Sequence, residues 1–193
     1  MKHEQLINSN FTSLSTLLES VPELDRKTMN DEGIKIAQVI KKGGTIFWCG
    51  NGGSAGDSQH LSAELVGRLV GNRRPLSSIS LSTDTSALTC IANDFGYETI
   101  FERQLEGLAN QNDYLVVLST SGNSKNILRV LKKAREMRVR TLSLLGKGGG
   151  EALKESDKSI IVSSETTARI QEMHKIIGHT ICQIIERELG FDN

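Results

Sequence analysis

The segment Thr45-Ile-Phe-Trp-Cys-Gly-Asn-Gly-Gly-Ser54 decides the fold, because a short apolar strand runs directly into a loop of Gly, Asn and Ser that opens a helix. The chain repeats this arrangement at Tyr114-Leu-Val-Val-Leu-Ser-Thr-Ser-Gly-Asn-Ser124. Glycine lets the backbone approach a ligand closely, and the free N–H groups at the start of the following helix favour an anion, most often phosphate. Two such loops predict a site for a phosphorylated small molecule.

Strand and helix patterns alternate along the rest of the core. The predicted strands are mostly apolar without alternation, as in a parallel sheet covered on both faces. They span residues 45–49, 77–81, 114–118, 141–145 and 159–163. Helices are predicted at 54–68, 85–92, 100–109, 124–137 and 149–155. We therefore expect an α/β doubly wound domain of three α/β/α layers with a five-stranded parallel sheet.

Helices are also predicted at both ends of the chain. Two N-terminal helices are broken near Pro22, and a long closing helix spans residues 167–189. The closing helix carries more apolar surface than one sheet face would cover. We expect a single domain over residues 1–193, in which the helices of 1–42 serve oligomer packing and 43–193 form the core and closing helix.

The composition excludes several classes of partner. Lys and Arg total 23, as do Asp and Glu, so no overall field recruits nucleic acid or an anionic membrane. The start lacks a signal-peptide layout and no apolar run could cross a bilayer, so we expect a cytoplasmic protein.

The chain has an odd number of cysteines, Cys49, Cys90 and Cys182, and all three lie in apolar surroundings. This predicts three reduced, buried thiols.

The first glycine loop also fits the dinucleotide pattern G-x-G-x-x-A. That pattern expects an acidic residue about 20 positions on, whereas the nearest candidate, Asp84, lies about 30 positions on. No Gly-Lys-Ser/Thr follows either loop, so a P-loop is excluded. We expect no nucleotide cofactor.

A tight turn capped by Ser remains the alternative interpretation of each of the two loops. A third glycine run, Lys147-Gly-Gly-Gly150, is interpreted as a plain turn.

Two groups of polar residues are candidates for chemistry. His60 and Glu64 are four residues apart on one helix face and could hold an ion or a substrate, although an exposed ion pair is the alternative. Polar residues on the closing helix interrupt its apolar stripe and need partners. They are Gln171, Glu172, His174 and His179. A hydrogen-bonded contact between helices is the alternative for His174, and spacing alone does not decide.

Four segments together carry a resemblance to a known family. They are Gly50-Asn-Gly-Gly-Ser-Ala-Gly-Asp-Ser-Gln-His-Leu-Ser-Ala-Glu64, Thr83-Asp-Thr-Ser-Ala-Leu-Thr-Cys-Ile-Ala-Asn-Asp94, Ser119-Thr-Ser-Gly-Asn-Ser124 and Ala168-Arg-Ile-Gln-Glu-Met-His174. The chain closely resembles the bacterial phosphoheptose isomerases of the sugar isomerase (SIS) family over nearly its whole length. It departs from them where alanine is expected, at Gly56, Ser58 and Ser62, and these changes touch helix propensity more than chemistry.

The resemblance implies an isomerase that interconverts sedoheptulose 7-phosphate and D-glycero-D-manno-heptose 7-phosphate, the first step toward activated heptose for lipopolysaccharide core or related glycans. It also implies one zinc ion per subunit and a homotetramer with active sites at subunit interfaces. The alternatives are a non-catalytic SIS-domain regulator that binds the replication initiator DnaA, and a phosphosugar-sensing module. The regulators lack the groups corresponding to Glu64 and His179, which this chain retains.

The same resemblance assigns roles to individual residues. The implied zinc ligands are His60, Glu64, Gln171 and His179. The implied substrate contacts are Asn51, Gly52, Gly53, Ser54, Glu64, Asn93, Asp94, Ser119, Thr120, Ser121, Ser124 and Gln171. Glu64 would shuttle the proton, and His179 would act as the acid and base at the sugar oxygens. The second loop would anchor the phosphate, while the first would receive the sugar end.

Overall fold

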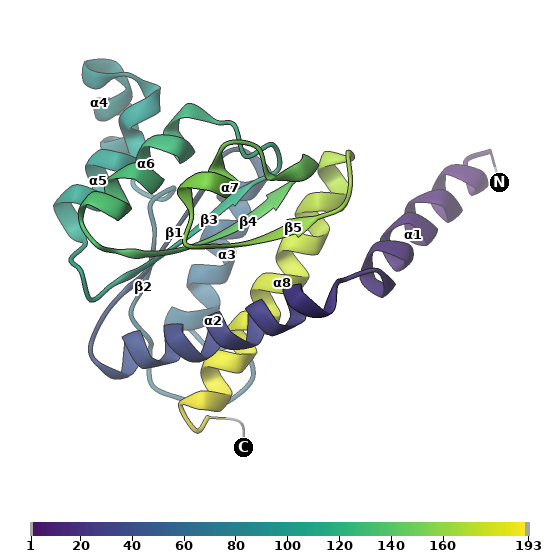
Figure 1. The fold of residues 1–193 in the computed structure, drawn as a ribbon, viewed down its shortest axis with the longest axis horizontal. Coiled ribbons are helices and arrows are strands. Elements are labelled where there is room, and N and C mark those ends of the chain that lie inside the picture. The colour runs from purple at the N-terminus through teal and green to yellow at the C-terminus, as the bar shows by residue number, and fades with distance from the viewer. Residues whose placement is uncertain (1, 192–193) are drawn as a thin grey trace.

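A computed structural model of the chain describes residues 2–191, which form one five-stranded, all-parallel sheet between two layers of helices (Figure 1). The strands are β1 (Ile46–Gly50), β2 (Ser78–Ser80), β3 (Tyr114–Ser119), β4 (Arg140–Gly146) and β5 (Lys158–Val162), in the spatial order β2-β1-β3-β4-β5. The sheet confirms the predicted doubly wound three-layer class. The predicted strand positions were correct to within one residue at each end.

The helices divide between the two faces of the sheet. They are α1 (Glu4–Glu19), α2 (Glu23–Lys41), α3 (Gly53–Val66), α4 (Thr85–Phe95), α5 (Ile100–Leu108), α6 (Lys125–Glu136), α7 (Ala152–Glu155) and α8 (Thr167–Glu188). One core cluster joins α2, α3 and α8 to one face, and a second joins α5, α6 and α7 to the other. The central strands β1 and β3 are buried at every position because both faces of the sheet are covered. In β1, for example, Trp48 belongs to the first cluster and Phe47 to the second.

The strand order places a topological switch point between β1 and β3. The chain leaves β1 through α3 toward β2 on one side, and leaves β3 through α6 toward β4 on the other. Gly50 is paired with Leu118, so both glycine loops emerge side by side at the carboxyl edge of the sheet. Ligands of open α/β sheets bind in the crevice at such a point. The fold therefore brings the two predicted phosphosugar loops together.

Two predicted helices differ from the structure. The helix expected over 85–92 continues to Phe95, so Asn93 and Asp94 lie in its last turn. The helix expected over 149–155 is only α7, preceded by a 3-10 turn at Lys147–Gly149. Gly148 and Gly149 have φ of 75° and 89°, values that a right-handed helix does not accommodate. The glycine run is thus a turn, as predicted.

The prediction of three buried thiols was wrong at one position. Cys49 and Cys182 are buried, and burial raises the pKa of both thiols. Cys90 is exposed, because α4, every residue of which is described, places none of its side chains fully in the core. All three cysteines are free.

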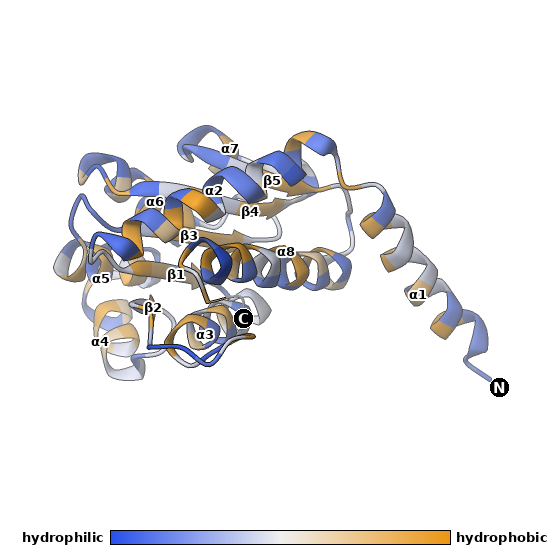
Figure 2. Cartoon of the chain, turned by 90° about the horizontal axis from the view of Figure 1, so that it is seen from below, coloured by the Kyte–Doolittle hydropathy of each residue, from blue (hydrophilic) through white to orange (hydrophobic). Residues whose placement is uncertain are grey.

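The N-terminal helices differ in how they pack. α2 buries Met29, Ile36 and Ile40 against α8 and the sheet, whereas α1, described over its full length, has no fully buried residue. Figures 1 and 2 show α1 extending away from the body of the molecule, and Leu6 and Phe11 on it are 60% and 75% exposed. Within residues 2–191, no helix combines the length and apolar character needed to cross a bilayer.

Candidate functional site

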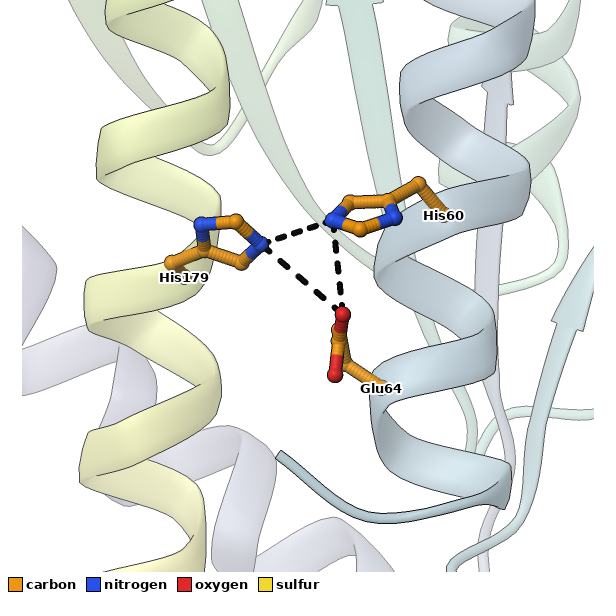
Figure 3. Close-up of side chains that lie close together, drawn as sticks. All are labelled: His60, Glu64 and His179. Atoms are coloured by element: carbon orange, nitrogen blue, oxygen red, sulfur yellow. Dashed lines mark hydrogen bonds and ion pairs between the residues drawn. The ribbon is translucent and has the colours of Figure 1, made fainter. Parts of the chain in front are cut away.

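Helices α3 and α8 bring His60, Glu64 and His179 together, although His179 is 119 residues from His60 in sequence (Figure 3). The helices approach closely because Gly178 has no side chain: a Cβ atom there would lie 2.7 Å from Cδ2 of Leu61. His60 and Glu64 are one helical turn apart and face α8. The three side chains therefore converge from two helices on the same side of the sheet.

The geometry of this triad suits a small, four-coordinate metal ion. The Nε2 atoms of His60 and His179 are 2.8 Å apart, and Oε1 of Glu64 lies 3.3 Å from the first and 4.0 Å from the second. Zinc ligands at about 2.0–2.2 Å in a tetrahedral arrangement are separated from one another by roughly 3.3–3.6 Å. The His60–Glu64 separation lies in this range and the other two lie on either side of it, and two imidazoles and a carboxylate are donors that zinc accepts.

Gln171, the fourth implied metal ligand, lies nearer to the first loop than to the triad. It precedes His179 by eight residues, or about 12 Å along the helix axis. Its amide packs against Gly53, where a Cβ atom would come within 2.5 Å of Nε2. Gln171 and His60 still line one cavity of about 560 Å³, which is also lined by Lys175 and Asp57, an ion pair of 3.2 Å.

A buried arginine holds the end of α3 against α8. Nη2 of Arg73 donates to the backbone carbonyl of Glu64 at 2.6 Å, and Nη1 donates to that of Leu65 at 2.8 Å. Nε of Arg73 donates to Glu186 of α8 at 2.6 Å. Burial raises the pKa of Glu186, but its hydrogen bonds from two backbone N–H groups and from Arg73 hold that pKa below the usual value. Sequence reasoning missed this pair, since residues 113 apart carry no spacing signal.

The first loop is held in an unusual backbone shape. Gly52 begins α3 at φ 56° and ψ −120°, where a side chain would be strained. Asn51 exchanges two side-chain hydrogen bonds with Asn126 of α6, at 2.9 and 2.8 Å, and accepts a third from Tyr97 at 2.9 Å. Ser54 is buried in the first turn of α3 rather than at the cap. Ser capping therefore does not explain this loop.

The second loop leaves hydroxyl groups at the start of α6. Ser119 and Ser121 accept hydrogen bonds from the backbone N–H groups of Gly122 and Asn123, at 3.1 and 3.2 Å. Gly122 has φ 65° and packs against the backbone of the 3-10 turn before α7. Ser124 occupies the N-terminal cap position of α6, and its side chain makes no capping hydrogen bond to any of the described residues. Thr120, half-buried, completes a hydroxyl-lined turn at a helix N-terminus.

Asn93 and Asp94 lie apart from the triad. Both are exposed on α4, which forms a corner of the molecule beyond α5 and α6 (Figure 1). Nδ2 of Asn93 donates to its neighbour Asp94 at 2.7 Å, and Cys90 also contacts that carboxylate. Among residues 2–191, the cavity shared by Gly53, His60 and Gln171 is thus not lined by these two implied substrate contacts.

Other polar residues have partners that differ from expectation. His174 is buried, and its Nε2 lies 3.1 Å from the carbonyl of Leu145 in β4, so it joins helix to sheet rather than helix to helix. Ser58 and Ser62 hydrogen-bond to hydroxyl groups of β2 at 2.8 and 3.1 Å. Where alanine was expected, these serines therefore bind α3 to the sheet, an effect larger than helix propensity.

Comparison with known proteins identifies the family. A family model described as SIS domain matches residues 10–146. A phosphoheptose isomerase of Helicobacter pylori is 48% identical over 94% of this chain and 92% of its own length, and one of Akkermansia muciniphila is 46% identical over 95% and 93%. The structure of phosphoheptose isomerase GmhA from Neisseria gonorrhoeae superposes with a TM-score of 0.90 at 33% identity, covering 95% of this chain and 98% of that one. The chain belongs to the SIS-domain phosphoheptose isomerases.

Proposed function

We propose that the chain interconverts sedoheptulose 7-phosphate and D-glycero-D-manno-heptose 7-phosphate. The observation that carries the proposal is the triad of His60, Glu64 and His179 on α3 and α8, beside two glycine loops at the switch point of the sheet. The product would supply heptose for lipopolysaccharide core or a related glycan. A cytoplasmic setting agrees with three free thiols.

Aldose–ketose isomerisation moves one proton between C1 and C2 while their oxygens exchange carbonyl and hydroxyl character. Glu64 takes the proton from one carbon and returns it to the other, and His179 would donate and accept the matching protons at the sugar oxygens through a ring nitrogen that is not bound to metal. Oε1 of Glu64 lies 3.3 and 4.0 Å from the two histidine nitrogens, and the second carboxylate oxygen would act as the base. A positioned base typically contributes about 10²–10⁴-fold to the rate.

Zinc is the metal that these residues suit best. His60, Glu64 and His179 would hold it, with Gln171 as a fourth ligand once its side chain turns from Gly53 toward the triad. A bound zinc ion supplies a Lewis acid that polarises sugar oxygens. The donor set is mixed nitrogen and oxygen, within the range that zinc accepts.

The second loop anchors the phosphate. The hydroxyl groups of Ser119, Thr120, Ser121 and Ser124 and the N-terminus of α6 together form an anion site that contains no Lys or Arg between residues 119 and 124. The C7 phosphate lies at the end of the sugar opposite C1 and C2. Holding it therefore orients the reacting carbons toward Asn51, Gly52 and Gly53 and the triad beyond them.

We further propose a homotetramer with active sites at subunit interfaces. The exposed apolar residues of α1, among them Leu6 and Phe11, provide a surface that a second copy would cover. Asn93 and Asp94 are exposed on α4, and in an assembly they would reach the site of a neighbouring subunit. Size measurement by light scattering tests the assembly, and a monomer under assay conditions would exclude it.

The decisive experiment incubates the purified protein with sedoheptulose 7-phosphate, with zinc and with a chelator. We expect aldose product with zinc, loss of it with chelator, and about a 100-fold lower rate in Glu64→Gln. No aldose product with zinc present would exclude the isomerase. Binding of the sugar phosphate without turnover would instead favour a sensing module, and capture of DnaA without turnover a regulator.

A further inference from the structure

The two glycine loops are joined to each other by side chains. Nδ2 of Asn51 donates to Oδ1 of Asn126 at 2.9 Å, and Nδ2 of Asn126 donates back to Oδ1 of Asn51 at 2.8 Å. Asn51 lies in the loop after β1, whereas Asn126 lies in the first turn of α6, directly after the loop that follows β3. This reciprocal amide pair spans the switch point of the sheet.

The pair fixes the orientation of the Asn51 amide. Its Oδ1 accepts one hydrogen bond from Asn126 and one from Tyr97. These two bonds occupy both lone pairs of the amide oxygen. Its Nδ2 donates one of two N–H groups to Asn126. One N–H of Asn51 therefore remains for a ligand, in a direction set by the other three hydrogen bonds. Asn126 is 2% exposed, so water does not compete for it.

No other side chain can make this connection from the first loop. Of residues 50–53, Gly50, Gly52 and Gly53 have no side chain beyond a hydrogen atom, which leaves Asn51. Gly52 adds a backbone shape that only glycine adopts readily. Gly50 ends β1, where it is paired with Leu118, and Gly53 begins α3, so the turn between them is Asn51 and Gly52. Among residues 50–53, the Asn51 amide is therefore the side chain that connects this turn to the phosphate loop.

We propose that Asn126 is a positioning residue that acts through Asn51 and sets the distance between the phosphate anchor and the loop that receives the sugar end. The inference rests on the proposed isomerase function. Asn126 need not touch the substrate itself. Its effect on the reaction is to keep Asn51 oriented while the phosphate is bound at Ser119–Ser124, so that C1 and C2 lie at the triad.

A double-mutant cycle tests this role. Asn126→Ala should lower kcat/KM about 10- to 100-fold, since small misplacements of reacting groups carry costs of this size. In an Asn51→Ala background the same substitution should change kcat/KM by about twofold or less, because its target is already absent. The loss should fall mainly on kcat, since the phosphate anchor is retained. If Asn126→Ala does not fold, Asn126→Asp provides the same comparison, because it keeps the acceptor for Asn51 and removes the donor.

Asn110→Ala is the matched control. Asn110 also donates a side-chain hydrogen bond, to Asp113 at 2.8 Å, but it precedes β3 at the opposite edge of the sheet. Its loss should lower the melting temperature without changing kcat/KM. Equal losses for Asn126→Ala in both backgrounds, or a loss confined to KM, overturn the positioning role. Absence of turnover in the wild-type protein overturns the proposed function instead, and the role assigned to Asn126 with it.

Discussion

His174 should make the stability of the chain fall as the pH drops below 6.5, which is above the pH at which most carboxyl groups begin to titrate. The carbonyl of Leu145 can only accept a hydrogen bond, so Nε2 of His174 carries the hydrogen and Nδ1 is the bare nitrogen of the neutral ring. Among the described residues, Nδ1 is buried and has no partner. Protonation would create a buried N–H without an acceptor. Burial accordingly lowers the pKa of His174 from 6.5 to about 4, against the effects of Leu145 and of the Asp57 charge.

The size and sign of the effect follow from these values. Above pH 6.5 the ring is neutral in both the folded and the unfolded chain, so its contribution is constant. As the pH falls below 6.5 the unfolded chain takes up a proton that the folded chain does not, and the free energy of unfolding decreases until about pH 4. Between pH 7.5 and pH 4.5 the loss amounts to about 2.5 kcal/mol.

Urea denaturation followed by circular dichroism, at half-unit steps from pH 7.5 to 4.5, measures this loss. A chelator is present throughout, so that metal binding does not add its own proton linkage. His174→Leu removes the titrating group. It also removes the hydrogen bond to Leu145, and the free-energy cost of that loss does not depend on pH. The free energy of unfolding of the wild type minus that of the variant should therefore fall by about 2.5 kcal/mol from pH 7.5 to pH 4.5. Parallel curves would refute the assignment of a neutral, buried His174.

Three further predictions concern the helix pair and the phosphate loop. Gly178→Val should cost about 1–3 kcal/mol in urea denaturation and weaken zinc binding, because its side chain would separate α8 from α3; unchanged zinc affinity would contradict this. Arg73→Met should cost about 3–5 kcal/mol in the same assay, since it leaves Glu186 buried without its cation, and a loss under about 1 kcal/mol would exclude that explanation. Ser121→Ala and Ser124→Ala should each raise the dissociation constant for sedoheptulose 7-phosphate in calorimetry, and unchanged affinity in both would count against the anchor.

The fold was predictable because its signals are local. Most of the strands are short apolar runs, and the Gly, Asn and Ser residues that follow β1 and β3 are types that also start a helix. The sequence predicted a parallel sheet but not the order of its strands, since the residue pattern of a strand does not identify the strands next to it. Errors occurred where local signals were weak, as at α4, where apolar spacing around Cys90 suggested burial that the tertiary packing does not provide.

The candidate site was predictable in part. The spacing of His60 and Glu64 identified a helix face, but not that His179 would meet it, because long-range contacts depend on which face of the sheet each helix covers. The pairs Asn51–Asn126 and Arg73–Glu186 were missed for the same reason. Such residues are separated by 75 and 113 positions, and no periodicity relates them.

The two glycine loops have different roles because of the helices that follow them. α3, after the first loop, lies on the same face of the sheet as α8, whereas α6, after the second loop, lies on the opposite face. Only α3 can therefore meet His179. His60 lies seven residues beyond Gly53, about 10 Å along the helix, so one element both begins at the sugar loop and carries the triad. α6 contributes only its N-terminus, which is the part of a helix that favours a phosphate.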